Sequence, residues 1–98
     1  MPRYLIERTF TVPIEEMPPI GRKSKQLTEG EFSSITWEHS HIIVTDDGTV
    51  RSYCIYAAPD EETVQRHALA LGQHVVDIVY EIAGDVAPSD YPDSQPRA

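Results

Sequence analysis

The feature of this sequence that most constrains its fold is a turn at residues 45–49 (TDDGT), between two segments of β-forming residues. Asp-Gly is a strong hairpin signal because the central positions of a tight turn need a positive φ, which these residues accept. Residues 35–44 before the turn and residues 50–58 after it are rich in β-branched and aromatic side chains. The sequence therefore predicts two antiparallel strands in the middle of the chain.

The segment before this hairpin predicts a strand followed by a helix. Residues 2–10 are rich in β-forming side chains. Three prolines make residues 11–19 a loop or a lead-in to a helix, because proline is not tolerated in a helix interior. The helix itself is expected over residues 19–29, with Gly30 at its end.

The segment after the hairpin predicts a second helix and a last strand. Asp60 can cap the free amides of a helix that begins just beyond it, and the acidic first turn suits the helix dipole. Four apolar residues share one face of this helix at i, i+4, i+7 and i+11: Val64, Ala68, Leu71 and Val75. Gly72 lies near its end, and residues 75–82 then predict a final strand.

These elements give the order βαββαβ, an α+β domain of ferredoxin-like layout over residues 1–83. We expect a four-stranded antiparallel sheet with both helices on one face. The strands carry more apolar side chains than one covered face needs: Trp37, Ile43, Tyr53, Ile55, Ile78 and Tyr80. A homodimer or higher homo-oligomer formed through the open sheet faces would bury them. Residues 84–98 are a proline-rich tail with no periodicity, expected to be extended or disordered.

Charge and cysteine content limit the classes of partner. The 98 residues include 16 acidic and 8 basic side chains, a formal net charge of −8, whereas a nucleic-acid-binding protein needs a basic surface. No segment approaches the roughly 20 apolar residues that cross a bilayer, and no signal-peptide pattern opens the chain. The single cysteine, Cys54, excludes an intrachain disulfide. We therefore expect a cytoplasmic protein without a nucleic-acid or membrane partner.

Histidines and acids on regular elements are the candidate functional residues, since the chain has no glycine-rich nucleotide loop and we expect no nucleotide cofactor. His39 and His41 lie two residues apart on a predicted strand, so their side chains share a face about 7 Å apart. Two imidazoles at this spacing can chelate one nickel, copper or zinc ion. The alternative is a solvated, hydrogen-bonded pair.

Two further residues are candidate ligands. His67 lies at the margin of the apolar stripe of the second helix and is expected to point toward the sheet. Glu7 and Arg8 alternate on the first strand, so one of them must point inward and needs a partner charge or a metal. One prediction is therefore a pairing of Glu7 with a cation, and the alternative is an ordinary ion pair between strands.

Four stretches of the sequence together resemble a known family. They are MPRYLIERTF, ITWEHSHI, SYCIYAAPDEETVQRHA and VVDIVYEI, spread over residues 1–83. The most specific is the run from Cys54 to Pro59 that leads into the helix with His67. The chain resembles the small nickel-binding-protein-like domains, long described as a domain of unknown function. The resemblance implies a ferredoxin-like fold, dimerisation through the sheets and, in some members, bound nickel.

The resemblance also implies where a metal would be held. Members that bind metal have an acid and a histidine on the first strand, at positions that look like Ile6 and Arg8 here, and further histidines on the helices. His67 matches one helix position, whereas Leu71 stands at another. Ile6 cannot ligate a metal and Arg8 would repel one, so this chain departs from the pattern on the first strand.

Three functions are open from the sequence alone. The first is a small dimeric protein that binds nickel or another divalent transition metal through His67, His39, His41 and Glu7. The second is a cofactor-free dimeric α+β-barrel enzyme (oxygenase, cyclase or isomerase type) that acts on a small hydrophobic molecule, with His39 or His67 as general base. The pocket of such an enzyme would be lined by aromatic residues: Trp37, Tyr53, Tyr56 and Tyr80. The third is a non-catalytic oligomeric scaffold.

Overall fold

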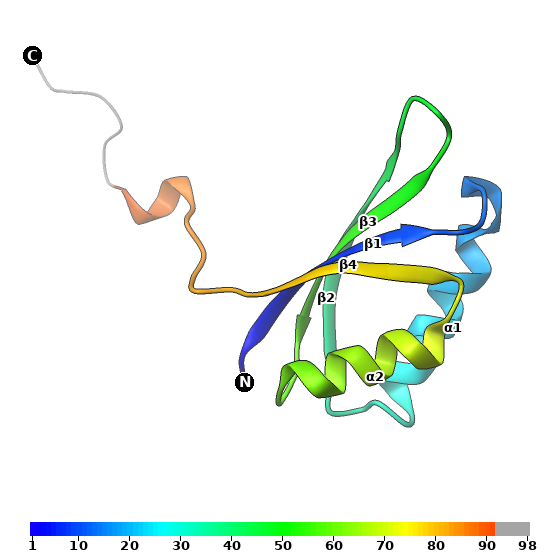
Figure 1. Cartoon of the computed structure of the whole chain (residues 1–98). Coiled ribbons are helices and arrows are strands. Elements are labelled where there is room, and N and C mark those ends of the chain that lie inside the picture. Colours follow the sequence, from blue (N-terminus) through cyan, green and yellow to red (C-terminus); the bar gives the residue numbers. More distant parts are fainter. Residues whose placement is uncertain (92–98) are drawn as a thin grey trace, which may run out of the picture.

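The computed structural model describes residues 1–91, which form a four-stranded sheet with two helices on one side (Figure 1). In chain order, the elements are β1 (Arg3–Phe10), η1 (Ile14–Glu16), α1 (Met17–Glu29), β2 (Thr36–Val44), β3 (Val50–Ala57), α2 (Glu61–Leu71), β4 (His74–Glu81) and η2 (Pro88–Asp90). The strands lie in the order β2-β3-β1-β4, and each neighbouring pair is antiparallel. The predicted ferredoxin-like order of elements is confirmed. Within residues 1–91, no helix is long and apolar enough to cross a membrane.

Local signals in the sequence fix two of these boundaries. The hairpin turn between β2 and β3 has Gly48 at a φ of 87°, and the Asp47 carboxylate accepts a hydrogen bond from the Thr49 amide at 3.0 Å. At the start of α2, the Asp60 carboxylate accepts a hydrogen bond from the Thr63 amide at 2.7 Å. These side chains satisfy backbone amides that would otherwise lack partners, so the predicted turn and helix start are both confirmed.

The start of α1 differs from the prediction. The helix begins at Met17, and η1 precedes it, so residues 11–19 are only partly a loop. Pro18 and Pro19 lie in the first turn of α1, where backbone amides have no partner within the helix and a missing N–H costs nothing. The prolines therefore mark the beginning of the helix and do not exclude it.

The two faces of the sheet differ in what covers them. Along β1, Ile6, Arg8 and Phe10 are buried beneath the helices, and we call this side the helix-covered face. Leu5, Glu7 and Thr9 alternate with them and point to the other side, which we call the open face. The main hydrophobic cluster lies between the sheet and the helices and contains Tyr4, Ile6, Phe32, Ile35, Cys54, Tyr56, Ala58 and Val64.

A bulge in β2 reverses the alternation of its side chains. Trp37 pairs with Tyr56, whereas His39 pairs with Ile55, so the register shifts between Trp37 and His39. Trp37 therefore lies on the helix-covered face, where its indole N–H donates to the Ser40 hydroxyl at 2.9 Å. The other five apolar residues expected to be surplus are on the open face: Ile43, Tyr53, Ile55, Ile78 and Tyr80.

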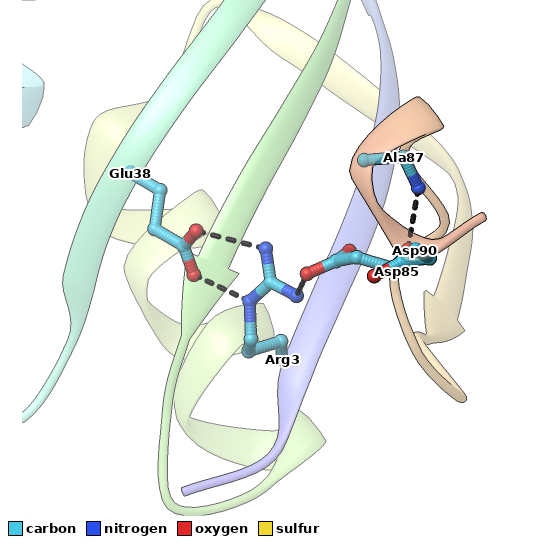
Figure 2. Close-up of polar contacts among 5 residues, drawn as sticks. All are labelled: Arg3, Glu38, Asp85, Ala87 and Asp90. Carbon is cyan, nitrogen blue, oxygen red and sulfur yellow. Dashed lines mark hydrogen bonds and ion pairs between the residues drawn. The ribbon is translucent and has the colours of Figure 1, made fainter. Parts of the chain in front are cut away.

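The chain after β4 is tied to the sheet by Arg3 (Figure 2). The Arg3 guanidinium donates through Nε and Nη2 to the two carboxylate oxygens of Glu38 at 2.7 and 2.9 Å, and through Nη1 to Asp85. Beyond this contact, η2 lies away from the sheet (Figure 1). The expected extended tail is thus described as far as residue 91, and its residues 92–98 lie outside the described part of the chain.

Candidate functional site

A cavity of about 490 Å³ lies between α1 and the helix-covered face of the sheet. Gly21 and Ser24 of α1 form part of one wall, and Arg8, Ser52 and Cys54 of the central strands form part of another. The remaining lining residues are almost all apolar: Phe10, Ile14, Met17, Pro18, Ile20, Trp37, Ser40, Ile42 and Leu71. A cavity of this size, apolar with a few polar groups, is typical of sites for small molecules.

Arg8 is the charged group in this wall. Its side chain is 1% exposed, because its place on β1 points it under the helices. Its Nη1 donates to the Tyr56 hydroxyl at 3.1 Å and contacts the Cys54 sulfur at 3.4 Å, and the guanidinium lies 5.2 Å from the centre of the Tyr56 ring. Its Nε and Nη2 are buried and have no hydrogen-bond partner.

No carboxylate from residues 1–91 accompanies this charge. Among the described residues, the buried polar or charged side chains are Arg8, Ser24, Ser52, Thr63 and His67, and none of them is an acid. A guanidinium that is removed from water without a counter-charge is costly. The helix-covered face therefore contains an uncompensated positive charge, although the chain as a whole has a net charge of −8.

His67 lies behind the cavity wall, on the face of α2 that points to the sheet. It is fully buried, between the rings of Phe32 and Tyr56, whose centres are 5.6 and 5.3 Å from its own. Burial, together with the nearby Arg8 charge, lowers the pKa of His67 from 6.5 to about 4. The imidazole is therefore neutral at physiological pH.

The contact between His67 and Ser24 is long, and it does not form a catalytic set. Nε2 of His67 is 3.4 Å from the Ser24 hydroxyl oxygen, and its Nδ1 is buried without a partner. In nucleophilic hydrolases, a third group on the second nitrogen orients the base. Among the described residues no such group contacts the Nδ1 of His67.

The structure divides the four predicted metal ligands between the two faces. His39 and His41 are exposed on the open face with ring centres 5.3 Å apart, whereas His67 is buried on the helix-covered face. Glu7 is on the open face and pairs with Arg51, which is also 3.8 Å from Asp77. Among the described residues, no three His, Cys, Asp or Glu side chains lie close enough to hold a metal ion.

The aromatic pocket expected from the sequence is only partly present. Trp37 lines the cavity, and Tyr56 lies next to it, in contact with Arg8. Tyr53, Tyr80 and His39 are on the open face and cannot contribute to the cavity. The sequence did not single out Ser24, because no motif marks it. The inward orientation of Arg8 was one of two options that strand alternation left open.

Comparison with known proteins assigns the family. Residues 4–82 match the family described as nickel responsive protein SCO4226-like. This chain belongs to the SCO4226-like family. No curated protein matches the chain. Among solved structures, the C-terminal domain of the MgtC protein from Mycobacterium tuberculosis is similar, with 15% identity and a TM-score of 0.60 over 86% of this chain and 88% of that one. At this identity the likeness concerns the fold alone.

The ligand positions implied by the family resemblance do not fit a divalent metal in this chain. Ile6, Arg8, His67 and Leu71 are all buried on the helix-covered face. His67 is the one imidazole among them, and the neighbouring charge is the Arg8 guanidinium, which pairs with no acid among the described residues. Nickel prefers imidazole, thiolate or carboxylate donors, and a buried cation next to the site opposes a second cation. The residues at these positions therefore do not fit nickel in this member of the family.

Proposed function

We propose that this protein binds a small, largely apolar molecule in the cavity between α1 and the sheet. The observation that carries the proposal is the cavity of about 490 Å³, whose wall is apolar apart from Arg8 and a few hydroxyl and thiol groups. Sites of about 300–1,000 Å³ with this composition are typical for small ligands. Because the described residues offer no oriented base or nucleophile, the proposal is binding and not a specific reaction.

A titration with a neutral bicyclic ester, methyl naphthylacetate, tests this proposal. Trp37 lines the cavity and is the single tryptophan of the chain, so its indole N–H resonance reports occupancy. We expect saturable one-to-one binding by calorimetry, together with a shift of that resonance.

Gly21→Phe is the blocking variant, because a Cβ at Gly21 meets no atom within 4 Å and the ring would extend into the cavity. Gln26→Phe, on the exposed side of the same helix, is the matched control. Binding that is lost in Gly21→Phe and kept in Gln26→Phe supports the proposal. Wild-type protein that binds neither this ester nor the corresponding acid, or equal binding by both variants, contradicts it.

A second candidate function is the binding of nickel or another divalent transition metal on the open face, in a homodimer. It is supported by the exposed His39 and His41 rings, 5.3 Å apart, and by the nickel-responsive description of the family. Two imidazoles leave coordination positions to fill, and a second copy stacked on the open face would supply two more. Glu7 could join them only by leaving Arg51.

We place either function in the cytoplasm, because Cys54 is a buried free thiol.

Native mass spectrometry with and without nickel, after purification without chelator, tests the second candidate. We expect a dimer that retains metal, and loss of the metal in the double variant His39→Ala/His41→Ala. His67→Ala is the matched control, since that imidazole lies on the other face. Protein that stays metal-free after nickel is added, or uptake that depends on His67, contradicts this candidate.

A further inference from the structure

We infer that the ligand of the cavity is a carboxylic acid, an apolar body with a single carboxylate that is bound by Arg8. The inference rests on the proposed function and adds to it the chemical class of the ligand. Its basis is the combination of a buried guanidinium without a counter-charge and an apolar cavity of which that side chain forms part of the wall.

The charge balance of the helix-covered face favours an anionic ligand. Arg8 is 1% exposed, and no acid is among the buried side chains of the described residues. An isolated buried charge is unfavourable, and an anion that enters the cavity would compensate it. One guanidinium balances one negative charge, which matches a carboxylate better than a phosphate, whose second charge would be left uncompensated.

Two nitrogens of Arg8 are without hydrogen-bond partners, and their positions suit a carboxylate. Tyr56 and Cys54 occupy Nη1 and leave Nε and Nη2, the pair of donors along one edge of the guanidinium. Arg3 uses the same two nitrogens to hold both carboxylate oxygens of Glu38, as Figure 2 shows. This edge fits a carboxylate in a bidentate manner. Both Arg8 nitrogens are shielded from solvent, so binding requires a small rotation of the side chain toward the cavity.

The rest of the cavity wall suits an apolar body with a single charged end. The residues that face the cavity beyond Arg8 are apolar or carry hydroxyl groups that can donate to a carboxylate oxygen, namely Ser24, Ser40 and Ser52. Within the described residues, no lysine and no second arginine lines this cavity. The charged end of the ligand would therefore lie at Arg8, and its apolar body would lie along the remaining, mostly apolar wall.

A matched pair of ligands, naphthylacetic acid and its methyl ester, tests the inference at neutral pH. The two differ in charge and share the bicyclic body. We expect the acid to bind at least 10-fold more tightly than the ester, because hydrogen bonds between charged groups are about twice as strong as neutral ones. We also expect the Arg8 Nε–H resonance to shift with the acid and to stay unchanged with the ester.

Two arginine variants test whether Arg8 causes the tighter binding of the acid. In Arg8→Met the acid should lose its advantage while the ester still binds, and in Arg51→Met, an arginine of the open face, the advantage should remain. Equal binding of acid and ester by the wild type overturns this inference and leaves the proposed function standing. An absence of binding for both compounds overturns the proposed function as well. If Arg8→Met does not fold, an unshifted Nε–H resonance in wild-type protein saturated with acid is enough to overturn the role of Arg8.

Discussion

Two neighbouring charged residues of β1 point to opposite faces of the sheet and have different partners there. Glu7 points to the open face, where it meets Arg51, and that arginine is also near Asp77. Arg8 points to the helix-covered face and meets a phenol, a thiol and an aromatic ring, but no acid. The charge on the open face is balanced within the protein. No acid among the described residues balances the charge on the helix-covered face, which is the reason for proposing ligand binding on that side.

The largest expected difference between the faces is in packing. Ile6 is fully buried on the helix-covered face, and Ile78 is 38% exposed on the open face. We expect Ile6→Ala to lower the free energy of unfolding by about 2–5 kcal/mol, since it removes buried methyl groups and leaves a cavity. Ile78→Ala should cost under about 1 kcal/mol in the monomer. Urea unfolding at low protein concentration measures both, and similar losses would show that the open face is covered even in the monomer.

The buried imidazole of His67 should make the stability of the protein depend on pH. Its folded pKa of about 4 is below the unfolded value of 6.5, so between these pH values the unfolded chain binds a proton that the folded chain does not. The free energy of unfolding should therefore be highest above about pH 6.5 and decrease as the pH falls toward 4, by about 3 kcal/mol in total.

His67→Gln isolates this effect, because the amide does not titrate. Unfolding curves across the same pH range should be flatter for the variant. The slope that remains comes in part from His74, whose pKa is also lowered by burial. A variant with the wild-type slope would indicate that His67 is accessible to protons in the folded state.

Replacing Arg8 and replacing Arg51 should change the free energy of unfolding by smaller amounts and in opposite directions. Arg8→Met replaces an uncompensated buried charge with an apolar side chain and should raise the free energy of unfolding of ligand-free protein by about 1–2 kcal/mol. Arg51→Met breaks the partly exposed pair with Glu7 and should lower it by about 0.5–1 kcal/mol. Thermal and urea unfolding give both values. A lower free energy of unfolding in both variants would mean that interactions within the protein already stabilise the Arg8 charge.

The smallest expected change in stability is for a substitution at Gly21, in the wall of the cavity. Gly21→Ala places a methyl group where no atom lies within 4 Å. It should stabilise the protein by about 0.4–1 kcal/mol, because alanine lowers the conformational entropy of the unfolded chain. Gly72→Ala is the contrasting variant: its φ of 72° strains any other residue, so stability should fall. A loss of stability in Gly21→Ala would show that α1 packs more closely on the sheet than the cavity indicates.

The strands and α2 could be predicted because short-range chemistry determines them. Asp47 and Asp60 accept hydrogen bonds from amides within three residues of themselves, and Gly48 adopts the positive φ of the turn. The order of elements then limits the sheet to few topologies. The start of α1 was harder to predict, since Pro18 and Pro19 are compatible with both a loop and a first helical turn.

The candidate site could not be read from the sequence for two physical reasons. Alternation shows that Glu7 and Arg8 face opposite ways, but not which of them faces the helices. The bulge between Trp37 and His39 then moves Trp37 to the helix-covered face, apart from the two histidines. The cavity combines residues from β1, α1, β2 and β3, and such long-range packing leaves no periodic signal.

The position of β2 at the edge of the sheet has a consequence for solubility. Its outer backbone groups pair with no strand among the described residues, and Ile42, Ile43 and Val44 are 45%, 43% and 50% exposed. An apolar edge strand of this kind can template aggregation. Glu38 and Asp46 flank the segment, and the net charge of −8 keeps molecules apart. Salt weakens this repulsion, so the protein should stay dispersed most readily in buffers of low ionic strength.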